Sequence, residues 1–120
     1  MQWQLRGDRP IYQQLMEQLT EQIVSGQLGA GDKVPPVREL AAEAGVNPNT
    51  VQRALAELEG TGLLHTQRTA GRFVTEDLSV IQSAKEKLAR GRTREYLSSM
   101  AQLGYSRQQV KALLDTWEEE

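Results

Sequence analysis

The feature that most constrains this chain is a tight turn between two short amphipathic segments, over residues 45–48. Gly45 ends the first segment, where helices commonly close with a left-handed residue. Asn47 can cap the second segment, and Pro48 suits the first helical position because its ring pre-sets φ. Apolar side chains recur at helical spacing in both segments, at Val37, Leu40, Ala41 and Ala44 and then at Val51, Ala54, Leu55 and Leu58. We therefore expect two short helices joined by a tight turn.

A longer amphipathic segment precedes this pair. Asp8, as a capping residue, and Pro10 should start a helix that ends near Gly26. Its apolar side chains recur every fourth residue, at Ile11, Leu15, Leu19 and Ile23. Residues 26–36 are rich in glycine and proline, so we expect a loop there, with a short extended piece at residues 33–34.

Two short runs typical of strands follow the capped helix. Residues 63–67 and 72–75 flank the turn sequence at residues 68–71, which predicts a hairpin with a basic tip. The order of helix, loop, two helices around a tight turn and a two-stranded ribbon is that of a winged helix-turn-helix. The predicted fold class is therefore mainly α with a small β-hairpin wing, followed by two C-terminal helices.

The last part of the chain, residues 76–120, predicts those two helices. The first should run from about Leu78 to Gln102, with a point of weakness at Gly91. The second should begin with a capping box at Ser106. We place the domain boundary between residues 1–75 and 76–120. Because the apolar side chains exceed what one helical hairpin can cover, we expect a homodimer. The expected dimerisation residues are Leu78, Ile81, Leu88, Tyr96, Val110, Leu113, Leu114 and Trp117.

The polar face of the capped helix points to double-stranded DNA. Asn49, Gln52 and Arg53 lie opposite the apolar stripe of that helix, and such side chains can pair with base edges in the major groove. Arg68 and Arg72 at the hairpin suit phosphate contact or entry into the minor groove. A polar face can also be merely solvated, but the joint spacing of turn, capped helix and basic hairpin favours DNA binding.

Composition excludes several other classes of protein. The 120 residues carry a net charge of −2 and contain one His. They contain no Cys, so disulfides, thiolate chemistry and Cys-ligated zinc are excluded. Neither a cofactor nor a metal ion is expected. No run reaches the roughly 18 to 20 apolar residues of a membrane helix, so we expect a cytoplasmic protein without a membrane partner. Residues 33–75 hold five basic and four acidic side chains, which is a slight local excess of positive charge.

Four stretches of the chain resemble a known family. They are GDKVPPVRELA at 31–41, GVNPNTVQRA at 45–54, GLL at 62–64 and GRFV at 71–74. They look like the DNA-binding domain of GntR-type bacterial transcription regulators, over about residues 8–75. The short helical tail looks like the YtrA subfamily, in which such a tail serves dimerisation. The pattern and the resemblance together predict a sequence-specific DNA-binding regulator that acts as a homodimeric repressor. The two-fold symmetry of such a dimer predicts an inverted-repeat operator. The sequence does not identify a small-molecule effector.

The resemblance also assigns site residues. It implies that Arg38, at the start of the first helix of the turn motif, contacts DNA and that the second helix of the motif reads the bases. It also implies that Gly71 allows the wing to turn tightly. The complete expected DNA-binding set is Arg38, Asn47, Asn49, Thr50, Gln52, Arg53, Arg68, Gly71 and Arg72.

Three departures from the family pattern matter. Pro36 stands where Ser is usual, so a hydroxyl cap is lost, at a cost of about 1 kcal/mol. Thr69 replaces the usual first wing glycine, and Arg72 replaces a usual Thr. Pro48 stands where some relatives place an arginine, which removes a base contact that they make.

Competing interpretations stay open at this point. The main rival is a winged helix used for protein contacts, and a small enzyme or metabolite-binding protein is a third possibility. The lone His65 suits a wing edge better than a metal site. No arrangement of nucleophile, base and orienting group supports catalysis. The basic cluster at residues 85–94 could touch flanking DNA, but a solvated helix face is the stronger expectation.

Overall fold

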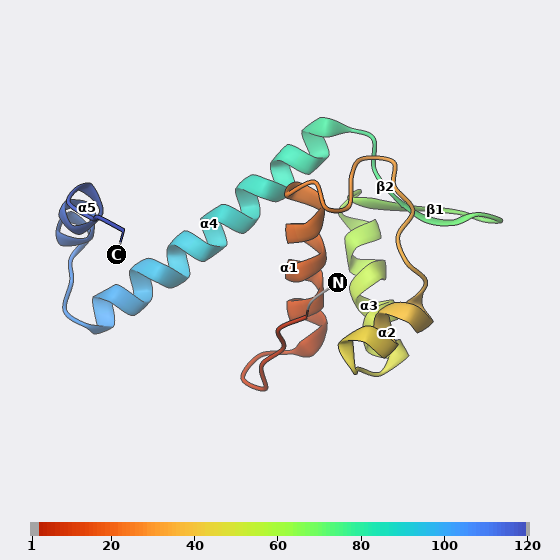
Figure 1. Ribbon diagram of the computed structural model, residues 1–120, viewed down its shortest axis with the longest axis horizontal. Helices are drawn as coiled ribbons and strands as arrows, with labels where there is room; N and C mark the ends of the chain where they lie inside the picture. Colours follow the sequence, from red (N-terminus) through yellow and green to blue (C-terminus); the bar gives the residue numbers. More distant parts are fainter. Residues whose placement is uncertain (1–2, 120) are drawn as a thin grey trace. The chain divides into compact units, whose positions relative to one another are not determined.

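The predicted fold class is confirmed in a computed structural model that describes residues 3–119 (Figure 1). The described elements are α1 (Ile11–Val24), α2 (Val37–Ala44), α3 (Pro48–Gly60), β1 (Leu64–Gln67), β2 (Gly71–Val74), α4 (Leu78–Gln102) and α5 (Arg107–Asp115). The chain divides into two compact units, the first ending at Glu86 and the second beginning at Lys87. None of the helices in the described part is long and apolar enough to cross a membrane.

The first unit extends beyond the boundary after Thr75 that the sequence predicts. Val80, Ile81 and Ala84 in the first turns of α4 pack against the core of this unit. α4 continues unbroken through Gly91, so one helix runs from the first unit into the second.

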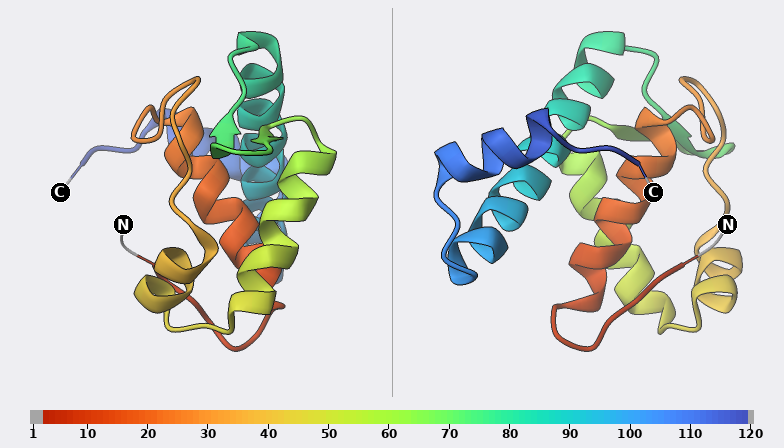
Figure 2. Two further views of the ribbon diagram at one scale, coloured as in Figure 1. Left: turned by 90° about the vertical axis from the view of Figure 1, so that its right-hand side faces the viewer. Right: turned by 60° about the vertical axis from the view of Figure 1, so that its left-hand side comes forward.

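The core of the first unit lies between α1, α2 and α3. α1 packs mainly against α3, and the two helices lie side by side in both views of Figure 2. The predicted apolar stripes supply the buried side chains. Those exposed by 3% or less include Leu15, Leu19, Ile23, Leu40, Val51, Ala54, Leu55, Leu58, Leu63, Leu64 and Val74.

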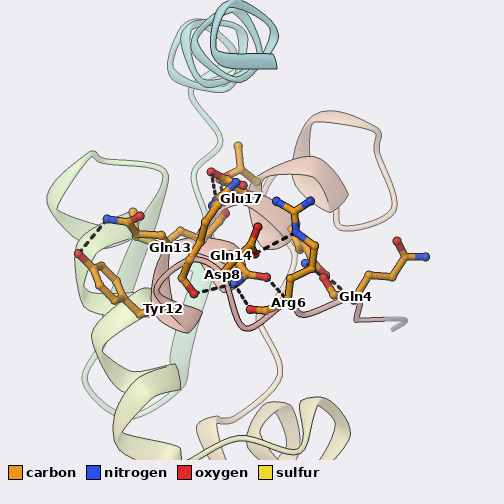
Figure 3. A network of polar contacts seen from close by, with 11 residues as sticks. Gln4, Arg6, Asp8, Tyr12, Gln13, Gln14 and Glu17 are labelled. Atoms are coloured by element: carbon orange, nitrogen blue, oxygen red, sulfur yellow. Dashed lines mark hydrogen bonds and ion pairs between the residues drawn. The ribbon is translucent and has the colours of Figure 1, made fainter. Parts of the chain in front are cut away.

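The start of α1 differs from the prediction. Pro10 is the N-cap without a side-chain cap bond, and Asp8 pairs with Arg6 at 3.3 Å instead of capping the helix. The buried Gln14 instead satisfies both backbone polar groups of Arg6 (Figure 3). Its side-chain amide accepts from the Arg6 N–H at 2.7 Å and donates to the Arg6 carbonyl at 2.6 Å. Gln18 bonds both backbone groups of Gln4 in the same way. Side-chain amides on α1 therefore hold the N-terminal segment where the sequence suggested a simple cap.

The turn between α2 and α3 follows the prediction. Gly45 has φ of +68°, which is the left-handed cap, and Asn47 Oδ1 accepts from the Asn49 N–H at 2.8 Å. Pro36 precedes α2 without any side-chain cap bond, as expected for a proline in place of Ser. Local capping thus sets both ends of this turn.

The hairpin is confirmed and has an additional neighbour. β1 and β2 are antiparallel, with Thr66 opposite Arg72 and Gln67 opposite Gly71. The extended piece at Lys33 and Val34 pairs with the other edge of β2, where the Val34 N–H donates to the Arg72 carbonyl at 2.9 Å. The wing is therefore anchored by the loop that precedes α2.

In the second unit, the end of α4 turns into α5. Gly104 adopts φ of +92°, and the predicted capping box at Ser106 is present, with Gln109 returning a bond to the Ser106 N–H at 2.8 Å. Val110 is 2% exposed, whereas Leu103, Leu114 and Trp117 remain between 58% and 73% exposed. This unit buries little of its apolar surface by itself.

Candidate nucleic-acid interface

The outer face of α3 is polar and open. Asn49, Gln52 and Arg53 are exposed, while the opposite stripe of the helix is buried. Thr50 is half-buried at the side of the helix, and Asn47 uses its side-chain oxygen for the cap, so its amide group is left to donate. This face carries amide and guanidinium groups, which are suited to base edges in the major groove.

Arg53 is held from the α1 side. Its guanidinium carbon lies 3.7 Å from the centroid of the Tyr12 ring. Tyr12 is half-buried on α1, and its hydroxyl accepts from Gln13 Nε2 at 3.3 Å. In Figure 3 Tyr12 points away from the side of α1 on which Gln14 meets the N-terminal segment. A cation over the face of an aromatic ring is attracted by the quadrupole of the ring.

A cluster of polar side chains at the end of α3 connects the wing to Gln52. Glu59 Oε1 accepts from Arg72 Nε and, at 2.8 Å, from the Thr66 hydroxyl. Arg72 also reaches Gln52, with a distance of 3.4 Å from its Nη1 to the Gln52 side-chain oxygen. The charged side chains of Arg72 and Glu59 are 20% and 30% exposed. We name Glu59, Thr66, Arg72 and Gln52 the wing clamp.

The wing clamp changes the role expected for Arg72. The sequence suggests a free cation near the wing tip, but the structure places Arg72 within β2 and pairs it with Glu59. The bond from Arg72 is the main cause that lowers the pKa of Glu59 below its ordinary value of 4.5, against the opposing effect of burial. At neutral pH the two charges offset each other, so Arg72 fastens the wing to α3.

The open cation of the wing is Arg68, which is exposed in the turn after β1. Gly71 ends this turn with φ of +105°, a conformation that favours glycine. The side chain of Lys33 passes over Gly71, because a Cβ built there would lie 3.2 Å from Lys33 Cε. The wing therefore presents an exposed Arg68 in its turn, and an exposed Lys33 lies beside Gly71.

Two other positions considered in the sequence lie on α2 and on β1 of the wing. Arg38 is exposed in the first turn of α2, with Glu39 next to it. His65 is exposed on β1 and stacks on Phe73 across the hairpin, with ring centroids 6.0 Å apart. Among residues 3–119, no three His, Cys, Asp or Glu side chains gather in a way that could hold a metal ion.

The predicted dimerisation residues divide into three groups. Leu78, Tyr96, Leu114 and Trp117 are exposed, by 40% to 70%, and are available to a partner. Val110 is buried within its own chain, and Ile81 packs against the core of the first unit. These two residues therefore offer a partner little apolar surface. The remaining two, Leu88 and Leu113, are half-buried.

Sequence reasoning missed three residues at this interface. Neither Tyr12 on the first helix nor Glu59 on the capped helix stands out in the sequence as part of a DNA-binding site. The sequence places Lys33 in a short extended piece and among the basic side chains of residues 33–75, without a role in binding DNA. The hairpin register places Thr66 opposite Arg72, so both lie on one face of the ribbon. No local signal in the sequence brings Glu59 of α3 to that face.

Comparisons with known proteins agree with this geometry. The family described as bacterial regulatory proteins, gntR family, matches residues 11–74. The HTH-type transcriptional repressor YtrA of Bacillus subtilis is 38% identical over 98 residues, which cover 82% of this chain and 71% of that protein.

Solved structures give the same result. A GntR family transcriptional regulator from Listeria monocytogenes superposes with a TM-score of 0.83 and 38% identity, covering 95% of this chain and all of the other. The DNA-binding domain of AraR in complex with operator ORX1 matches with a TM-score of 0.58 and 28% identity, over 62% of this chain and 96% of the other. The chain therefore belongs to the GntR family of bacterial regulatory proteins, as a DNA-binding transcriptional regulator of the YtrA-like kind.

Proposed function

We propose that the chain is a repressor that binds an inverted-repeat operator as a homodimer, with α3 reading bases in the major groove and the wing contacting phosphates. The observation that carries this proposal is the outer face of α3, where Asn49, Gln52 and Arg53 are exposed above a buried stripe. The DNA-binding domain of the similar protein AraR has been solved in complex with an operator, and the similar protein YtrA is a transcriptional repressor. Both facts support the same role for this chain. We infer a regulator without catalytic activity that acts in the cytoplasm, where bacterial DNA lies.

The proposed dimer uses the second unit and α4. Leu114 and Trp117 are 58% and 61% exposed in the single chain, and a two-fold interface needs one self-complementary patch to cover them. Paired reading helices then require half-sites about one helical turn apart, roughly 10 bp, or a multiple of it. We accordingly assign dimerisation to α4 and α5.

The test is selection of DNA fragments from a random pool by the purified full chain, followed by affinity measurements on the selected operator and on a scrambled duplex. Arg53→Ala and Arg38→Ala should both weaken operator binding, since each bidentate contact of an arginine to guanine contributes about 1 to 3 kcal/mol of discrimination. Both side chains are exposed, so thermal melting should change little, and Arg53→Ala loses only the contact with Tyr12.

The matched control is Glu57→Gln, which removes an exposed charge from α3 outside the predicted reading residues. Affinity for duplex DNA should fall with rising salt, because phosphate neutralisation releases counterions. Unchanged operator affinity in both arginine variants would refute the reading face. A pool without enrichment and without salt dependence would favour the rival function, a winged helix that binds another protein.

A further inference from the structure

The contact between Arg53 and Tyr12 joins a predicted reading residue to a residue of another helix. The guanidinium carbon lies 3.7 Å from the ring centroid, which is close stacking. Tyr12 is half-buried on α1, and α1 packs against α3 within one compact unit. A half-buried ring on a packed helix is a firm support, whereas Arg53 by itself is an exposed side chain with many rotamers.

The kind of support matters for reading a base. A carboxylate partner would occupy the N–H groups of the guanidinium and offset its charge. An aromatic ring instead covers the flat face, so the N–H groups at the edge of the guanidinium stay available. Those edge donors are the atoms that pair bidentately with the O6 and N7 acceptors of guanine. The ring can therefore fix Arg53 without competing with DNA.

We propose that Tyr12 is a positioning residue for DNA recognition, and that its ring holds the Arg53 guanidinium in place for contact with a guanine. This inference rests on the proposed function, in which α3 reads the operator. Tyr12 itself touches no base. It acts through Arg53, by reducing the conformational freedom that Arg53 would otherwise lose on binding DNA.

The test uses full-length Tyr12→Leu, which removes the ring, and Tyr12→Phe, which keeps the ring and removes the hydroxyl. The base pair that Arg53 reads is first identified on the selected operator as the one whose replacement costs wild type affinity but costs Arg53→Ala nothing further. Tyr12→Leu should lower discrimination at this base pair by about two- to fivefold, the range expected for an exposed cation–π contact. Tyr12→Phe should stay close to wild type.

Three further readouts separate positioning from a general structural role. The salt dependence of binding should be unchanged in Tyr12→Leu, because the number of phosphate contacts is the same. In the Arg53→Ala background, Tyr12→Leu should cause no further loss of affinity. In the DNA-free protein, NMR should show the Arg53 side-chain protons shifted by the ring in wild type and Tyr12→Phe, and unshifted in Tyr12→Leu.

Each contrary result has a distinct meaning. Equal discrimination in wild type and Tyr12→Leu, or a gain of affinity in Tyr12→Leu, would overturn the proposed positioning. A loss that persists in the Arg53→Ala background would show that Tyr12 acts on the fold, and would overturn it as well. An Arg53→Ala protein that binds the operator like wild type would refute the proposed reading face itself, and with it the role of Tyr12.

Discussion

The two compact units of this chain differ in how they bury apolar side chains. In the first unit, residues from four helices and the wing converge on one core, and Leu55 and Val74 are 1% and 0% exposed. In the second unit, Val110 is buried, but Leu103 and Trp117 are 73% and 61% exposed. The first unit contains enough elements to surround a core. The last part of α4 and the nine-residue α5 are too few elements to surround a core. Contact with another chain would therefore stabilise the second unit by covering its apolar side chains.

The units also differ in what they leave for other molecules. The first unit pairs Arg72 with Glu59 and stacks Arg53 on Tyr12, so its polar surface is partly organised within the chain. The second unit exposes apolar side chains at the end of α5 and beyond it. On this contrast we propose that the first unit recognises DNA and that the second unit mediates self-association.

The largest expected effect comes from removing the second unit. A chain that ends at Glu86 should fold as a monomer and bind the two-site operator about 10² to 10⁴ times more weakly, because the two half-sites are no longer linked. Sedimentation and titration of operator DNA measure both properties. A shortened chain that still dimerises, or binds as tightly as the whole, would remove the distinction between the units.

A chain that ends at Thr75 provides the matched comparison for the boundary. It lacks Val80, Ile81 and Ala84, which pack against the core of the first unit. We expect it to melt at a lower temperature than the chain that ends at Glu86. Equal melting temperatures would place the boundary back at the position that the sequence predicts.

The next effect contrasts one leucine from each unit. Leu55→Ala should lower the free energy of unfolding by about 2 to 5 kcal/mol, because it removes a side chain that is 1% exposed and leaves a cavity. Leu114→Ala, at a side chain that is 58% exposed, should leave unfolding of the dilute chain nearly unchanged and weaken the dimer. Chemical denaturation and sedimentation separate the two results. If both variants lose the same unfolding free energy, the units do not differ as described.

A smaller effect distinguishes the two arginines of the wing. Arg68→Ala should reduce the salt slope of DNA binding by about 0.9 per protomer, since Arg68 is exposed and can neutralise a phosphate. Arg72→Ala should leave the slope nearly unchanged and lower the melting temperature, because Arg72 fastens β2 to α3 through Glu59. Affinities measured over a range of salt concentrations decide between these roles. A fall in slope in Arg72→Ala equal to that in Arg68→Ala would mean that the wing clamp opens on DNA.

The smallest effect is the response of the wing clamp to acid. Its bond with Arg72 lowers the pKa of Glu59 below 4.5, so the stabilisation is complete above pH 4.5 and is lost as the pH falls through the lowered value. Glu59→Gln should therefore destabilise the protein at neutral pH and close the gap to wild type in acid. Glu57→Gln, at an exposed residue of the same helix, is the control. A gap that stays constant with pH would show that the charge of Glu59 contributes nothing.

Much of the fold was predictable because its decisive interactions are local. Gly45, Asn47 and Ser106 cap helices within a few residues of themselves, and the apolar stripes follow from helical spacing. Asp8 shows the limit of this reasoning. Asp8 is a residue type that commonly caps helices, and it stands just before α1, yet the structure pairs it with Arg6. The side chain of Gln14, on α1, accepts a hydrogen bond from the Arg6 backbone N–H instead.

The sequence by itself determined the helices, the tight turn, the hairpin and the exposed polar face of α3, because each depends on neighbouring residues and on the period of the element. The tertiary structure decided which of the polar side chains act together. Arg53 meets Tyr12 because α1 packs beside α3, and Arg72 meets Glu59 because the wing folds back on the end of α3. Contacts of this kind join segments that are distant along the chain, and no local spacing encodes which ring or carboxylate will lie next to a given arginine.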